Sequence, residues 1–204
     1  MADMDSSAAG PVAVSPRVRG IRLRRQILRC AADLASIDGL DVVSIARLAA
    51  AMGMSKSGLY AYFISKQDLQ IATIDCAWAV FEEHVLEPTD DLDALLARWV
   101  SYYEREVFPG GCLFVTAGIE FANRDGPVHD ALSGAIDRQV AALEDRIALA
   151  RESGRLPPDA DPRQLGFELH AILAAGNQRF RISRDRTAFD HARTAIGRLL
   201  AHPE

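Results

Sequence analysis

The sequence predicts an all-α protein of about nine helices, in which an N-terminal helix-turn-helix domain precedes a larger helical domain. Three observations support this prediction. Apolar residues recur at three- and four-residue spacing through most of the chain, which is the period of a helix with one buried face. Serine or aspartate precedes many of these stretches, and glycine or proline follows them, as at helix ends. No stretch alternates apolar and polar residues as a half-buried strand would.

The length and composition are typical of a globular protein. The chain has 204 residues, of which 49% are hydrophobic and 25% are charged, and this is enough to bury a substantial core. No apolar run approaches the length of about eighteen residues that a membrane helix needs. Residues 1–16 contain two acids and no base, so they lack the basic start of a secretory signal. We therefore expect a disordered leader over 1–16 and a cytoplasmic protein with no membrane contact.

The reactive residue types do not form a recognisable catalytic or metal-binding pattern. The three cysteines, Cys30, Cys76 and Cys112, are far apart and odd in number, which argues against a disulfide framework. The cysteines and histidines do not have the spacing of metal ligands. The chain also lacks a serine-histidine-aspartate order and a phosphate-binding glycine loop. We expect no enzyme activity, no metal and no cofactor.

The stretch 44–69 has the pattern of two short helices joined by a turn. Ser44 and Ser55 stand at N-cap positions, and Gly53 between them can adopt a positive φ without a Cβ clash. The inward positions are Ile45, Leu48, Ala49 and Met52 in the first helix, and Leu59 and Phe63 in the second. The outward positions of the second helix are Ser55, Lys56, Ser57, Tyr60 and Tyr62. These residue types suit contacts with phosphates and base edges, so the stretch is a candidate helix-turn-helix.

Four motifs in this stretch together resemble the N-terminal domain of the tetracycline-repressor (TetR) family. They are Ser-Ile-x-x-Leu-Ala from Ser44, Ala-Met-Gly-Met-Ser from Ala51, Gly-Leu-Tyr-x-Tyr-Phe from Gly58, and Ser-Lys-x-x-Leu from Ser65. The resemblance covers residues 20–70. It implies a ligand-responsive transcriptional regulator, most often a repressor, that binds a palindromic operator in double-stranded DNA as a homodimer. An unidentified small-molecule effector would release it from the operator.

The resemblance also implies a division of the chain and a set of DNA contacts. Residues 17–70 would be the DNA-binding domain, and residues 71–204 would bind the ligand and dimerise through the last two helices. Phosphate contacts are expected from Ser44, Tyr60 and Lys66. Base readout is expected from Ser55, Lys56, Ser57 and Tyr62, with Gly58 allowing close approach of the backbone. The alternative for either tyrosine is partial burial against the first helix.

The charge distribution agrees with this division. Residues 17–70 carry a net charge of +5, whereas residues 71–204 carry −8. A basic module joined to an acidic body is typical of proteins that bind a polyanion through one domain, although any chain cut in two shows some imbalance. The arginines between 17 and 25 are either a solvated helix face or a flexible arm that reaches the DNA.

The remaining helices are expected from periodicity and from their ends. They cover 17–38, 65–87 with Pro88 as the stop, 90–107, 112–122, 128–153, 161–182 and 186–201. Several of them would line the inducer cavity that the resemblance implies, and an apolar cavity suits a hydrophobic small molecule. The candidate ligand contacts are Trp78, Phe81, Trp99, Tyr103, Phe114, Glu120, Phe121, His170 and Asn177. Any one aromatic residue in this set is more often core.

Two residues raise separate questions. Glu120 is an acid within an apolar run and needs a partner, which could be an arginine or a cationic ligand. Cys112 follows two glycines at an expected helix N-terminus, where a thiol has a lowered pKa. It is either a small buried residue or the sensor of an electrophile- or redox-responsive regulator. A third possibility, a helical interaction protein that does not bind DNA, would leave the Gly53 turn and the basic segment unexplained.

Overall fold

The all-α fold is confirmed. The computed structural model describes residues 16–87 and 89–201, and within them the chain forms nine α-helices, one π-helical turn and no strand. The α-helices are α1 (Pro16–Asp38), α2 (Ile45–Met52), α3 (Lys56–Tyr60), α4 (Lys66–Phe81), α5 (Leu92–Glu104), α6 (Leu113–Phe121), α7 (Pro127–Glu152), α8 (Pro162–Ser183) and α9 (Thr187–Ala201). The predicted leader, apart from Pro16, and the predicted stop at Pro88 lie outside the described residues.

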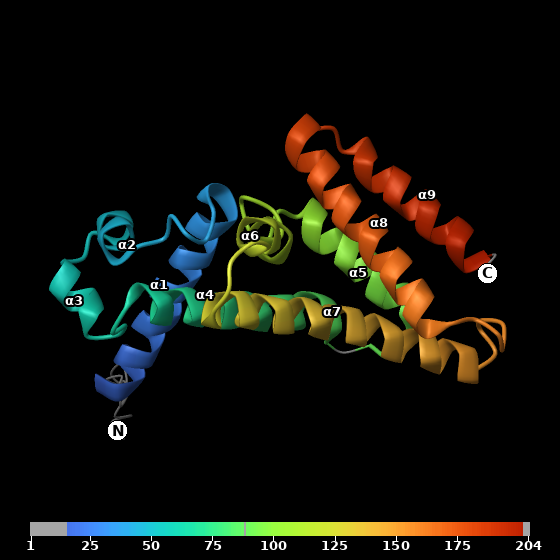
Figure 1. Cartoon of the computed structure of the whole chain (residues 1–204), viewed down its shortest axis with the longest axis horizontal. Helices are drawn as coiled ribbons and strands as arrows, with labels where there is room; N and C mark the ends of the chain where they lie inside the picture. Colours follow the sequence, from blue (N-terminus) through green and yellow to red (C-terminus); the bar gives the residue numbers. More distant parts are fainter. Residues whose placement is uncertain (1–15, 88, 202–204) are drawn as a thin grey trace, which may run out of the picture.

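The helices form a small N-terminal unit and a larger body (Figure 1). Helices α1, α2 and α3 lie at one end of the molecule, and α4 runs from this end along α7. Helices α8 and α9 pair at the opposite end, with α5 beside them. Helix α6 packs against both α1 and α7. Both α4 and α6 therefore connect the small unit to the body.

Local capping explains where four of the helices begin. Side-chain oxygens of Ser44, Ser55, Ser65 and Asp161 accept hydrogen bonds from backbone N–H groups in the first turns of α2, α3, α4 and α8. These bonds satisfy donors that have no partner within the helix. At α4 the cap is reciprocal in part, because Asp68 accepts from the backbone N–H of Ile64 at 3.0 Å. All four caps occupy positions predicted from the sequence.

Two predicted helix ends are wrong. Helix α3 ends at Tyr60 rather than Phe63, because the chain tightens there and the N–H of Tyr62 donates to the carbonyl of Leu59, three residues back. Helix α5 ends at Glu104 rather than at residue 107, and Glu106 then adopts φ +48°. The long helix expected up to residue 87 is present, but its last part, Glu82–Leu86, is a π-helical turn.

Gly110 lies where the body touches the end of α1. Its N–H donates to the Ser36 hydroxyl at 2.9 Å, and a Cβ added to it would lie 1.8 Å from the Ser36 carbonyl oxygen. No side chain larger than hydrogen fits this approach without a shift of backbone. This glycine therefore allows the loop after α5 to pack directly on α1.

In the described part of the chain, no helix is both long enough and apolar enough to cross a lipid bilayer.

Candidate nucleic-acid interface and effector cavity

The turn between α2 and α3 has the geometry of a helix-turn-helix. Gly53 adopts φ +63°, and the N–H of Met54 donates to the carbonyl of Ala49 at 2.9 Å, which closes the end of α2. Leu48 and Leu59 are fully buried beneath the two helices. This left-handed residue lets the chain reverse within two positions, so α3 projects from the small unit (Figure 1).

The outward face of α3 is exposed, and the charge of its one lysine is not neutralised by an ion pair within the part of the chain that the structure describes. Ser55, Lys56, Ser57 and Tyr60 are all exposed, with Tyr60 at 58%. Among residues 16–87 and 89–201, the Lys56 ammonium has no ion-pair partner. The Ser55 hydroxyl accepts from the Gly58 N–H at 3.1 Å, and a Cβ at Gly58 would approach it to 3.2 Å. The face therefore offers hydroxyls, one free ammonium and one phenol to a partner.

Tyr62 is partly buried against the first helix, which is the alternative to a role in base readout. It is half-buried and lines a hollow with Arg19, Arg22 and Leu23 of α1. Because residues 17–25 belong to α1, the flexible-arm interpretation of their arginines is wrong. These arginines are instead exposed side chains of a helix that packs against α2 of the helix-turn-helix.

Lys66 occupies the first position of α4 and is already paired. Its Nζ lies 2.7 Å from Asp41 Oδ1, while Arg124 Nη1 lies 3.0 Å from Asp41 Oδ2. The hydrogen bonds from Lys66 and then Arg124 lower the pKa of the Asp41 carboxyl. Lys66 is exposed, and its cationic group stands at a helix N-terminus where a phosphate is also favoured.

Glu120 has a partner that the sequence did not suggest. Its carboxylate accepts from the backbone N–H groups of Leu40 and Asp41, at 2.7 and 3.0 Å. From the other side, Gln70 of α4 donates to the Leu40 carbonyl at 3.1 Å. The expectation that Glu120 pairs with an arginine or a cationic ligand is therefore wrong, because backbone donors satisfy it. Helices α4 and α6 hold the turn before α2 from two directions.

A cavity of about 350 Å³ lies between α6, α7 and α8. Its lining residues are Phe114, Val115, Gly118, Ile119, Ile136, Gln139, His170, Ala171, Ala174, Ala175 and Gln178. Phe114 and His170 are therefore the predicted ligand contacts that the structure brings together. Sequence reasoning missed Gln139, a polar residue at an inward position of the alanine-rich helix α7.

The other predicted ligand contacts do not line this cavity. Trp99 donates from Nε1 to the Tyr103 hydroxyl at 2.7 Å, and both residues are buried. Phe81 and Trp99 pack edge to face with ring centroids 4.8 Å apart. Cation–π contacts cover Trp78, from Arg138 at 4.0 Å, and Phe121, from Arg124 at 4.6 Å. These side chains are packing residues, which is the more common role of aromatics at helical spacing.

Cys112 is a buried residue rather than an activated thiol. It precedes α6 as expected, and its N–H donates to Asn177 Oδ1 at 3.4 Å, which gives Asn177 a structural role. Burial raises the pKa of the Cys112 thiol despite the backbone N–H groups of Val115 and Phe114, which favour the thiolate. The expected lowering of this pKa is wrong because desolvation exceeds the effect of the helix N-terminus.

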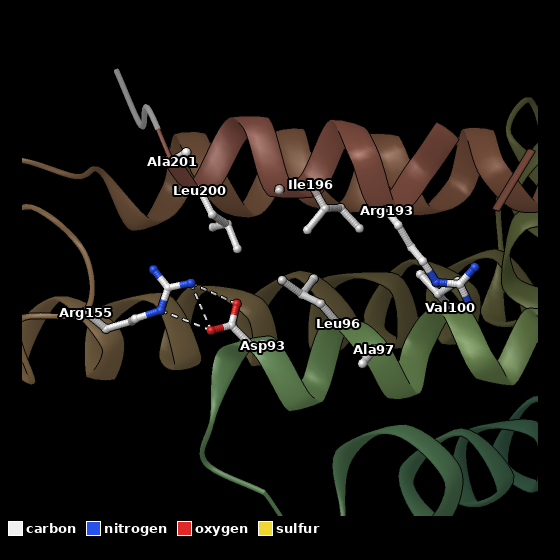
Figure 2. Close-up of a pocket in the computed structure, with 10 residues that line it drawn as sticks. Asp93, Leu96, Ala97, Val100, Arg155, Arg193, Ile196, Leu200 and Ala201 are labelled. Carbon is white, nitrogen blue, oxygen red and sulfur yellow. Dashed lines mark hydrogen bonds and ion pairs between the residues drawn. The ribbon is translucent and has the colours of Figure 1, made fainter. Parts of the chain in front are cut away.

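A second cavity, of about 370 Å³, lies between α5 and α9 (Figure 2). Leu96 from α5 faces Ile196 and Leu200 from α9 across it. Arg155 pairs with Asp93 at 2.9 Å at one end, and Arg193 contacts Glu104 near the other. Both arginines already have carboxylate partners, so this cavity is an apolar slot with an ion pair near each end.

In the described ranges, three or more histidine, cysteine, aspartate or glutamate side chains do not gather as a metal site would require.

Two family models cover most of the chain. The model described as bacterial regulatory proteins, tetR family, matches residues 27–73, and the model described as tetracyclin repressor-like, C-terminal domain, matches residues 88–196. None of the curated proteins matches the chain significantly.

Solved structures share the architecture over nearly the whole length. A TetR transcriptional regulator from Chloroflexus aurantiacus J-10-fl is 25% identical with a TM-score of 0.81, covering 90% of this chain and 96% of its own. A TetR-family regulator from Cytophaga hutchinsonii is 22% identical with a TM-score of 0.78, covering 94% and 98%. The structure of AibR with isovaleryl coenzyme A and operator DNA is 23% identical with a TM-score of 0.69, covering 87% and 97%. The chain therefore belongs to the TetR family of transcriptional regulators.

Proposed function

We propose that this DNA-binding regulator acts as a repressor, that it binds a palindromic operator as a dimer, and that a small molecule in the α6–α7–α8 cavity releases it. The observation that carries the proposal is the outward face of α3. Lys56 and Tyr60 stand there exposed beside the hydroxyls of Ser55 and Ser57. Short polar and basic groups on a projecting helix suit the major groove, while Ser44 and Lys66 suit the flanking phosphates.

An apolar face on α8 supports the dimer. Phe167 and Ile182 are 68% and 73% exposed. The exposed Ala171 and Ala175 lie between them at helical spacing and also line the α6–α7–α8 cavity, so the dimer face adjoins that cavity. Large exposed apolar residues in a row mark an interaction surface, and small residues among them let two helices approach closely. A symmetric dimer would present two α3 helices to successive major grooves, about 34 Å apart.

The relation of α6 to both sites supports ligand control. Helix α6 contributes Phe114, Val115 and Gly118 to the cavity, and Glu120 on the same helix holds the turn at Leu40 and Asp41. A ligand that prefers one position of α6 would bias the position of α2 and α3, because a ligand shifts an equilibrium by its differential affinity for two states. AibR, a structural neighbour, has been crystallised with both isovaleryl coenzyme A and operator DNA.

The electrophile-sensing alternative has no comparable support, because Cys112 is buried and the pKa of its thiol is raised. Regulators of this family are generally not enzymes.

Fluorescence anisotropy with the DNA upstream of its own gene tests the proposal. We expect saturable binding that weakens as salt increases, because each neutralised phosphate releases counterions. Unlabelled DNA of the same composition but scrambled order should compete poorly. Binding that is absent, or equal for the upstream and scrambled DNA, would contradict a sequence-specific regulator.

A further inference from the structure

The α6–α7–α8 cavity is lined without a charged side chain. No lysine, arginine, aspartate or glutamate is among its lining residues. His170 is its one titratable residue, and burial lowers the pKa of that imidazole, so the ring is neutral at neutral pH. A charged group in this cavity would be partly dehydrated by the apolar lining and would find no opposite charge among the lining residues, which is unfavourable.

Gln139 gives the cavity an unused hydrogen-bond donor. This residue is 2% exposed, lines the cavity, and has a buried Nε2 without a hydrogen-bond partner among the described residues. Buried donors are nearly always paired, and an unpaired one is costly. The rest of the lining is mainly apolar, from Phe114 and Ile136 to the alanines of α8.

We propose that the cavity binds an uncharged, mainly apolar molecule that carries a hydrogen-bond-accepting oxygen, and that Gln139 is the residue that selects for this oxygen. The inference rests on the proposed function for its regulatory meaning, but the binding itself does not depend on DNA. At about 30 Å³ for each water-sized group, the cavity takes about ten to twelve non-hydrogen atoms. Medium-chain ketones, esters and lactones have this size and chemistry.

Three probes of the same chain length bury the same apolar chain, so differences in their binding report the effect of the head-group charge. We would measure the melting temperature of the full-length protein with 2-nonanone, nonanoate or nonylamine at equal concentrations. A ligand of the folded state raises the melting temperature by mass action, so we expect a rise with the ketone and little with the two ions. Equal shifts for ketone and carboxylate, or no shift with the ketone, would overturn the proposal.

Two glutamine variants then test the selecting residue. In Gln139→Leu the unpaired donor is removed, so we expect the free protein to melt at the same or a higher temperature, while the ketone binds about tenfold more weakly. Gln164→Leu is the matched control, because Gln164 is exposed on α8 and is not among the residues that line the cavity, and we expect it to keep the affinity of the wild type. If Gln139→Leu fails to fold, Gln139→Met keeps the chain length and removes the same donor. Unchanged ketone affinity in a folded variant at position 139 contradicts the assignment.

The outcomes also distinguish this inference from the proposed function. Ketone binding by a protein that does not bind its upstream DNA would leave the cavity assignment intact and overturn the regulator. Specific DNA binding by a protein that is stabilised only by one of the two ions would leave the regulator intact and overturn the cavity assignment.

Discussion

At the scale of single residues, the two lysines of the chain, Lys56 and Lys66, have different surroundings. Lys56 is exposed without an ion pair in the described part of the chain, whereas Lys66 is held 2.7 Å from Asp41. We expect Lys56→Ala and Lys66→Ala each to weaken operator binding and to lower the salt slope by about 0.9 per subunit. Lys56→Ala should cost more affinity, because Lys66 must leave Asp41 before it reaches a phosphate.

Anisotropy titrations at several salt concentrations check this expectation. Arg163→Ala, which removes an exposed base at the start of α8, is the control for a general loss of positive charge. The same slope in both lysine variants as in wild type would show that neither residue contacts DNA.

A second prediction at this scale concerns Cys112. Because burial raises the pKa of its thiol, the thiolate fraction at neutral pH is smaller than for a free cysteine, and labelling should accelerate only as pH rises toward the raised pKa. We expect an aromatic disulfide reagent to modify the half-buried Cys30 or Cys76 before Cys112, with mass spectrometry locating the label. Cys112 reacting first at neutral pH would restore the sensor hypothesis. Release of wild type, but not of Cys112→Ser, from DNA by an oxidant would do the same.

At the scale of elements, the loop after α5 depends on one glycine. A Cβ at Gly110 would lie 1.8 Å from a backbone oxygen of α1, so Gly110→Ala should lower the free energy of unfolding by about 3 kcal/mol or more, the upper range for overpacking. Gly134→Ala is a matched control, because a Cβ there meets nothing within 4 Å on the surface of α7. It should stabilise the protein by about 0.5–1 kcal/mol through helix propensity. Equal effects in urea unfolding would show that the α1 contact is dispensable.

Glu120 makes a second contact between elements. In Glu120→Gln one oxygen that accepts from Leu40 or Asp41 becomes an NH₂ group, which cannot accept a hydrogen bond. We expect about 1–2 kcal/mol of lost stability from weaker hydrogen bonding, and weaker operator binding although every candidate DNA contact is intact. Asp125→Asn, an exposed neutralisation just after α6, is the control. Operator affinity that stays at the wild-type value would limit Glu120 to a structural role.

Most of the helix-turn-helix was predictable because its signals are local. Ser44, Ser55 and Gly53 act on backbone groups within a few residues, so their positions define α2, the turn and the start of α3. The end of α3 was not predictable, because it depends on the backbone N–H of Tyr62, which donates three rather than four residues back, to the carbonyl of Leu59.

The cavity was predictable only in part. Aromatic residues mark the body of the protein as apolar, but periodicity does not separate Phe114, which lines the cavity, from Phe81, which is packed among other rings. Gln139 carries no local signal, and only the packing of α6 and α8 on α7 shows its amide as buried. The need of Glu120 for a partner was predictable, but its partner lies eighty residues away at Leu40.

At the scale of the whole molecule, charge and shape agree with a two-part regulator. The basic residues 17–70 contain the projecting helix α3. The acidic remainder contains the cavity and the apolar face of α8. Like charge repels most of the body from the DNA phosphates, so the molecule approaches DNA with its small end. In the body, Phe167 and Ile182 of α8 are exposed, so this apolar face is free to pack against a second copy of the chain.

The most direct measurement of the central claim is a nuclease footprint of the purified protein on the DNA upstream of its own gene, compared with Lys56→Ala. We predict two protected half-sites related by inverted repeat and centred about one helical turn or a multiple apart, with protection by Lys56→Ala requiring a higher protein concentration. Uniform weak protection of the whole fragment, or an unchanged footprint at the same concentration for Lys56→Ala, would contradict the claim that the outward face of α3 reads DNA.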